Sequence, residues 1–143
     1  MVSGVGENSY SQKYYLGLDI GSVSLNTVIL DDKFTVIEEH YDYVHGKPFD
    51  VLLERLSSVL EKYSPASIEG LALTGTGGKL AASLTGGLFV NEIIAQATSA
   101  GRLYPDAKTV IEIGGEDSKL IVLEKDPSED HARLVDFEMN SIC

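Results

Sequence analysis

Two apolar segments of the chain each end in an acidic residue that is followed, two positions later, by glycine. The first segment ends at Asp19 before Gly21, and the second ends at Glu112 before Gly114. Glycine lets backbone N–H groups come close to phosphate oxygens, whereas a carboxylate binds phosphate only by way of a hydrated Mg²⁺. These two acidic turns, the first from Asp19 to Gly21 and the second from Glu112 to Gly114, therefore predict a cleft that holds the phosphate tail of a nucleotide through magnesium.

The hydrophobic periodicity predicts an α/β protein with a mixed sheet in the order βββαβαβα. The first three strands are expected to be antiparallel, and the strand after the first long helix is expected to lie parallel to the first strand through a right-handed crossover. The expected strands span 14–20, 24–30, 34–44, 68–74 and 88–90, and the expected helices span 49–63, 79–84 and 91–103. Three further strands at 108–113, 118–124 and 131–137 repeat the βββ opening and then stop.

Composition limits the classes of partner. At 143 residues and 43% hydrophobic content, the chain is long enough to bury a core. Its net charge of −11 argues against an electrostatic grip on nucleic acid or on an anionic membrane. One cysteine, no apolar run of membrane-spanning length and no signal-peptide pattern favour a reducing, cytoplasmic location. Residues 1–13, which are rich in serine, glycine and polar side chains, are expected to be a disordered lead-in.

The order of elements and five ordered motifs together resemble one family of ATPases. The motifs lie at residues 16–22, 73–77, 91–93, 110–119 and 137–143. They are similar to those of the activators of 2-hydroxyacyl-CoA dehydratases and benzoyl-CoA reductases, the BadF/BadG/BcrA/BcrD ATPase family. This family belongs to the actin, sugar-kinase and heat-shock-chaperone ATPase superfamily.

The resemblance implies a duplicated ribonuclease H-like fold, with nucleotide bound between its two halves. Residues 14–106 would form the first ribonuclease H-like ATPase subdomain, and residues 107–143 would form the first three strands of the second. The chain is thus expected to be the N-terminal part of a longer activator, inactive alone.

The function implied by the resemblance is ATP-dependent electron delivery. A homodimer would hold one [4Fe-4S] cluster between its subunits, and ATP hydrolysis with Mg²⁺ would drive a low-potential electron to an acyl-CoA dehydratase or reductase. Cys143 would be a ligand of that cluster, although a lone cysteine is more often an inert buried thiol. A cluster needs about four thiolates, so none is expected in this chain alone.

The candidate site residues follow from the two turns. Asp19 is expected to bind Mg²⁺, because an acid at the end of an apolar strand is costly unless it is paired, solvated or facing a metal; it could instead merely cap the turn. The expected backbone donors to phosphate are Gly21, Ser22 and Val23 in the first turn and Gly114 and Gly115 in the second. A Gly-Gly pair is also common in ordinary hairpin turns.

Three other acids are candidates for the site, and two of them are open to two interpretations. Glu112 stands where the superfamily usually has aspartate, and it is expected to reach the magnesium shell through water. Glu92 is expected to position the attacking water, or else to be a favourable acid in the first turn of a helix capped by Asn91. Asp117 could belong to the metal shell or to the hairpin.

Two other functions use the same fold. One is a small-molecule kinase that transfers phosphate to a sugar or an acid, and the other is a non-catalytic regulatory module that changes shape on binding nucleotide. The segment from Met139 to Cys143 favours the activator, because a kinase has no reason to keep it.

Overall fold

The structure, a computed structural model, describes residues 12–114 and 117–141. It divides the chain into two compact parts, the first unit (residues 1–89) and the second unit (residues 90–143), and each is described by itself. Most of the lead-in expected over residues 1–13 lies outside the described residues, and so do Gly115 and Cys143. The division at residue 106 that the resemblance implies stays a prediction about the whole protein.

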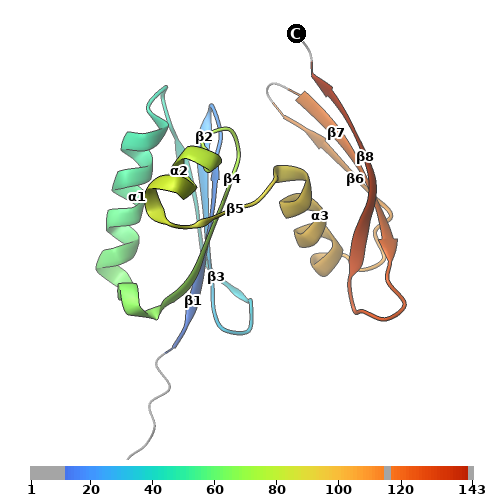
Figure 1. The fold of residues 1–143 in the computed structure, drawn as a ribbon, viewed down its shortest axis with the longest axis horizontal. Coiled ribbons are helices and arrows are strands. Elements are labelled where there is room, and N and C mark those ends of the chain that lie inside the picture. The colour runs from blue at the N-terminus through green and yellow to red at the C-terminus, as the bar shows by residue number, and fades with distance from the viewer. Residues whose placement is uncertain (1–11, 115–116, 142–143) are drawn as a thin grey trace, which may run out of the picture. The chain divides into compact units, whose positions relative to one another are not determined.

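The first unit is built on a mixed sheet of five strands among its described residues, in the order β3-β2-β1-β4-β5 (Figure 1). The strands are β1 (Tyr14–Ile20), β2 (Ser24–Leu30), β3 (Val36–Tyr43), β4 (Ile68–Thr74) and β5 (Leu88–Phe89). The pairs β1·β2 and β2·β3 are antiparallel, whereas β1·β4 and β4·β5 are parallel. β1 therefore lies in the interior of this sheet, with hydrogen-bonded neighbours on both sides.

Helix α1 (Pro48–Lys62) covers one face of this sheet, as Figure 1 shows. Pro48 starts the helix, since its missing N–H costs nothing in the first turn. Leu52 and Val59 of the helix share one core with Leu16 and Ile20, which point to the same side because strand residues alternate between faces. Asp19, between the buried positions of β1, therefore belongs to the opposite face of the sheet.

Two short elements complete the first unit. A 3-10 turn, η1 (Pro65–Ser67), leads from α1 into β4. Helix α2 (Gly78–Thr85) follows β4 and ends at Gly86, which adopts a left-handed conformation at φ 76°. Glycine is the usual residue at such a helix end because it has no Cβ to clash there.

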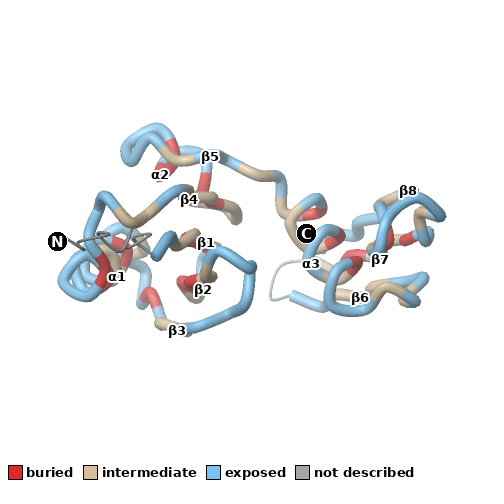
Figure 2. Tube along the Cα trace, turned by 90° about the horizontal axis from the view of Figure 1, so that it is seen from below, coloured by how far each residue is buried: buried red, intermediate tan, exposed pale blue. Residues whose placement is uncertain are grey.

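The second unit packs helix α3 (Glu92–Leu103) against an antiparallel sheet in the order β6-β7-β8. The strands are β6 (Thr109–Ile113), β7 (Asp117–Lys125) and β8 (Ala132–Ser141). This unit has a core of its own, formed by Ile93, Ala97, Ile121, Leu123 and Ala132. Figure 2 shows buried positions within each unit. Helix and strand come very close at Gly101, where a Cβ would lie 2.1 Å from the backbone oxygen of Ala132.

The observed order βββαβαβα, followed by βββ, confirms the fold predicted from the sequence, and most bounds agree within two residues. The clearest difference is β8, which extends to Ser141 rather than ending at residue 137, because Asp117, Ser118 and Lys119 pair with its last residues.

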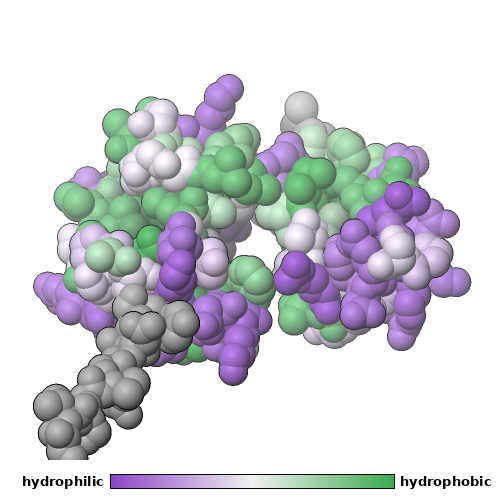
Figure 3. Space-filling view, turned by 60° about the horizontal axis from the view of Figure 1, so that its bottom comes forward, coloured by the Kyte–Doolittle hydropathy of each residue, from purple (hydrophilic) through white to green (hydrophobic). Residues whose placement is uncertain are grey.

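Apolar side chains also reach the surface of each unit, beside hydrophilic ones (Figure 3). In α2 and β5 they are Leu80, Leu84, Leu88 and Phe89. Across the described ranges, no helix combines the length and the apolar character that a bilayer crossing requires.

Candidate functional site

The turn after β1 is closed by a hydrogen bond from the N–H of Gly21 to the carbonyl of Ser24, 2.9 Å long. Ser22 and Val23 lie exposed at its tip. The N–H of Gly21 is already used within the hairpin. A phosphate contact from this group would therefore compete with the bond that closes the turn.

Asp19 stands at the end of β1, where two other elements meet it. Its Oδ2 accepts a hydrogen bond from the Asn26 side chain, across the β1–β2 pair, at 3.4 Å. On the other side Asp19 pairs with Thr74 of β4, whose hydroxyl oxygen is buried and has no hydrogen-bond partner among the described residues. Polar atoms buried without a partner are rare, so this hydroxyl marks a place where a polar ligand would be favourable.

The glycine loop after β4 packs directly against the same strand end. Gly75 has φ 81°, and a Cβ at this position would lie 2.5 Å from Oδ1 of Asp19 and 2.6 Å from the carbonyl oxygen of Ile20. The N–H of Gly77 donates to that carbonyl at 2.9 Å. Only a residue without a side chain permits this approach, so the loop and the acidic turn form one local structure.

The hairpin of β6 and β7 has the same closing hydrogen bond as the first hairpin. The N–H of Gly114 donates to the carbonyl of Asp117 at 2.9 Å, three residues on, as Gly21 does to Ser24. The carboxylate of Glu112 lies beside Gly114, since a Cβ on Gly114 would be 3.2 Å from its Oε1. Asp117 is therefore a hairpin residue through its backbone, which was one of its two expected roles.

A lysine that the sequence patterns did not single out joins the candidate acids of the second unit. The ammonium of Lys119 donates to Glu112 at 2.6 Å, to Asp117 at 2.7 Å and to Glu92 at 3.3 Å. Its side chain is only 4% exposed. Burial opposes the charge of Lys119, but hydrogen bonds to Asp117 and Glu112 and the nearby Glu92 raise its pKa well above the usual range.

Glu92 lies in the first turn of α3, directly after the helix cap. The side chain of Asn91 accepts a hydrogen bond from the N–H of Ile93 at 2.9 Å and so caps the helix. An acid in the first turn is favourable beside the helix N-terminus, and the ion pair with Lys119 fixes it further. This geometry fits the structural interpretation of Glu92, and its role in positioning water stays a prediction.

Within the described residues, no His, Cys, Asp or Glu side chains gather in a group of three or more arranged to hold a metal ion. The carboxylates of Glu92, Glu112 and Asp117 surround the ammonium of Lys119 instead.

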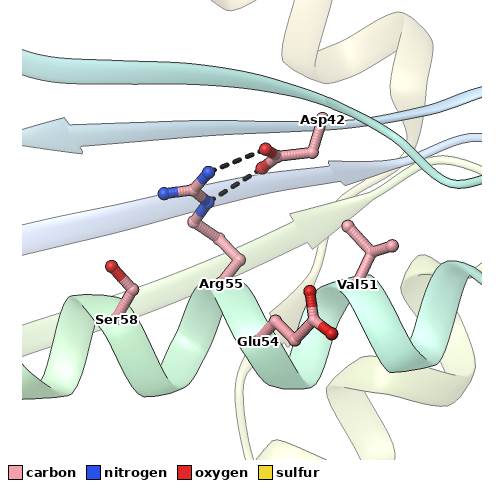
Figure 4. Close-up of a pocket in the computed structure, with 5 residues that line it drawn as sticks. All are labelled: Asp42, Val51, Glu54, Arg55 and Ser58. Carbon is pink, nitrogen blue, oxygen red and sulfur yellow. Dashed lines mark hydrogen bonds and ion pairs between the residues drawn. The ribbon is translucent and has the colours of Figure 1, made fainter.

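A shallow hollow between α1 and β3 is a structural feature rather than a site (Figure 4). Arg55 donates two parallel hydrogen bonds to Asp42, 2.8 and 2.7 Å long, and the guanidinium lowers the pKa of that carboxyl. Both charges are thereby used to attach the helix to the sheet. The predicted site residues are not among the five that line the hollow: Asp42, Val51, Glu54, Arg55 and Ser58.

The fold and its acidic glycine turns define the class of protein. The sheet order, with a βββ opening that recurs in the second unit, is that of the ribonuclease H-like, actin-like ATPase fold. Residues 16–143 match the BadF/BadG/BcrA/BcrD ATPase family, and the chain belongs to this family.

A dehydratase activator shares this fold. The chain is 30% identical over 132 residues to the (R)-2-hydroxyglutaryl-CoA dehydratase activating ATPase of Acidaminococcus fermentans, covering 91% of the chain and 48% of that protein. The crystal structure of component A of the same organism's dehydratase matches with a TM-score of 0.75 and 29% identity, over 92% of the chain and 48% of that structure.

A second solved structure shows a relative with nucleotide bound. It is the activator of the 2-hydroxyisocaproyl-CoA dehydratase from Clostridium difficile with bound ADPNP, with a TM-score of 0.71 and 26% identity over 91% of the chain and 46% of that structure. The chain thus spans about half the length of the curated relatives it matches.

Proposed function

We propose that the protein is an ATP-binding and ATP-hydrolysing activator. In this role it would couple hydrolysis to the delivery of a low-potential electron to a 2-hydroxyacyl-CoA dehydratase-type enzyme. Membership of the ATPase family supports this proposal, as do two relatives that are activators of dehydratases. The single structural observation that carries it is the strand end at Asp19. There a carboxylate and a close glycine loop meet a buried hydroxyl that has no hydrogen-bond partner in the described part of the chain.

Asp19 fits a magnesium ion by its chemistry. Carboxylate oxygens are the protein ligands that Mg²⁺ prefers, and the ion keeps several waters that neighbouring polar groups can hold. The hydroxyl of Thr74 is such a group. Magnesium would neutralise phosphate charge during hydrolysis, and Glu112 would reach its shell through water.

The phosphates would be bound by backbone groups of the two acidic turns. The proposed donors are Gly21, Ser22 and Val23 in the first turn and Gly114 and Gly115 in the second. To donate to phosphate, Gly21 and Gly114 would have to release their hydrogen bonds to Ser24 and Asp117. Backbone donors suit a chain of net charge −11, because cationic side chains are scarce in it. Glu92 is proposed to orient the attacking water.

The residues of this chain by themselves do not fit an iron-sulfur cluster. The sequence has one cysteine, Cys143, so two copies would supply two thiolates, whereas such a cluster takes about four. We propose Cys143 as one ligand in the whole protein, which would be a cytoplasmic homodimer, and we derive no electron-transfer step from this chain.

Substitution of Asp19 tests the proposal. In the whole protein, Asp19→Asn should lower the kcat of ATP hydrolysis by about 100-fold or more, because the metal would lose its charged ligand. The matched control is Asp32→Asn, the same change on the exposed turn between β2 and β3. Full Mg²⁺-dependent hydrolysis by Asp19→Asn would refute the assignment, and no hydrolysis by the unmodified protein would refute the proposed function.

A further inference from the structure

The two acidic turns differ in the side chain that faces the acid from the next strand. Asp19 and Glu112 each bond to the residue seven positions later on the paired strand. In the first turn that residue is Asn26, a neutral amide, and in the second it is Lys119, a cation. Equivalent positions in the repeated hairpin thus carry different charges.

Each N–H donor of the Lys119 ammonium has a carboxylate oxygen to which it can donate. A lysine has three N–H donors and no acceptor, and Lys119 meets one oxygen from each of three carboxylates at 2.6, 2.7 and 3.3 Å. Glu92 comes from α3, Glu112 from β6 and Asp117 from β7 itself. One buried cation therefore joins the start of the helix to both strands of the hairpin.

The three carboxylates depend on this cation. Like charges that share a site repel one another unless a positive charge lies between them. Carboxylate oxygens are also the ligands that hard cations take, with Ca²⁺ binding oxygen at about 2.3–2.6 Å in flexible geometry. Here the three carboxylates surround the ammonium of Lys119.

We propose that Lys119 is a built-in counter-ion that replaces a bound cation at the second acidic turn, where its ammonium holds the carboxylates of Glu92 and Glu112. The ammonium fixes both carboxylates at the turn without a divalent ion. For the role of these acids in hydrolysis the inference rests on the proposed function, in which magnesium is bound at Asp19. The presence of the counter-ion itself does not depend on nucleotide.

Calcium binding by a lysine variant tests the inference. Lys119→Met keeps an unbranched side chain that is one atom shorter and removes its charge, so the three carboxylates should bind one additional Ca²⁺ per chain. Lys119→Arg retains the charge and should bind no additional ion. The matched control is Lys125→Met on the same strand, whose side chain is 62% exposed and pairs with Asp106 alone among the described residues.

Isothermal titration of the chain with calcium chloride, without nucleotide, gives the stoichiometry of each variant. Thermal unfolding with and without Ca²⁺ gives a second readout, in which Ca²⁺ should raise the Tm of Lys119→Met more than that of the control. A folded Lys119→Met that binds no more Ca²⁺ than the unmodified chain would overturn the inference. A Lys119→Met that stays unfolded in Ca²⁺ would also overturn it, because the ion would then not replace the ammonium.

The titration separates this inference from the proposed function. It contains no ATP, so its result does not depend on whether the protein hydrolyses ATP. Extra calcium binding by Lys119→Met together with an inactive unmodified protein would support the counter-ion and reject the ATPase.

Discussion

The close contact between the loop after β4 and the end of β1 leads to a quantitative prediction for Gly75→Ala. Gly75 has φ 81°, and its added Cβ would lie 2.5 Å from Oδ1 of Asp19 and 2.6 Å from the backbone oxygen of Ile20. Gly86 has a similar φ of 76°, but a Cβ there meets nothing within 4 Å. Alanine at either position therefore incurs the same cost for its left-handed backbone, the backbone term. Only Gly75→Ala adds a cost for the close contacts of its Cβ, the steric term.

The backbone term is about 1–2 kcal/mol, the cost of a left-handed conformation for a residue with a Cβ. Gly86→Ala should lower the free energy of unfolding by that amount alone. Gly75→Ala adds overpacking against backbone and carboxylate, which costs about 1–3 kcal/mol further. The expected total at Gly75 is roughly 2–5 kcal/mol.

Urea unfolding of both variants, followed by circular dichroism, measures the difference directly. Because both glycines belong to the first unit, the same transition reports on each. Equal losses of stability in the two variants, within about 0.5 kcal/mol, would refute the close approach of the loop to Asp19. The proposed function adds a second result, since Gly75→Ala should weaken Mg²⁺-dependent ATP binding and Gly86→Ala should not.

Two further predictions concern stability. Lys62 and other hydrogen-bond donors lower the pKa of Glu38 from 4.5 to about 2, so this carboxylate stabilises the folded state above pH 4.5, and the contribution is lost as the pH falls toward 2. Glu38→Gln should flatten the pH dependence of the urea midpoint in that window, and an unchanged slope would contradict the ion pair. Gly101→Ala should destabilise the second unit by about 1–3 kcal/mol or more, because its Cβ would meet the backbone of Ala132; an unchanged Tm would contradict this packing.

Local sequence patterns were sufficient to predict the order of elements in the fold. The helix at Pro48–Lys62 follows from its apolar spacing and its proline start, and the strands of the first unit follow from alternation and glycine turns. The extension of β8 to Ser141 could not be read from residues 138–141, which are largely polar. Those residues are held in the strand by their pairing with β7, a tertiary effect that local patterns do not contain.

The candidate site was predictable in part. The sequence indicated Asp19, Glu92 and Glu112 as chemically important, and the structure brings Glu92 and Glu112 to one ammonium. Lys119 itself was overlooked, although the period of two places it on the same strand face as the buried Ile121 and Leu123. A lysine on the buried face of a strand needs an anionic partner. That rule would have indicated that acidic side chains surround Lys119.

The position of each acidic turn within its sheet has a consequence for amide hydrogen exchange. β1 has a hydrogen-bonded neighbour on each side, whereas β6 is an edge strand of the sheet in the described part of the second unit. Backbone amides of the strand that carries Asp19 should therefore exchange with deuterium only when their whole unit opens. The amides of β6, which leads to Gly114, should exchange through local fraying. The strand before the first acidic turn is therefore expected to stay folded while the strand before the second opens locally.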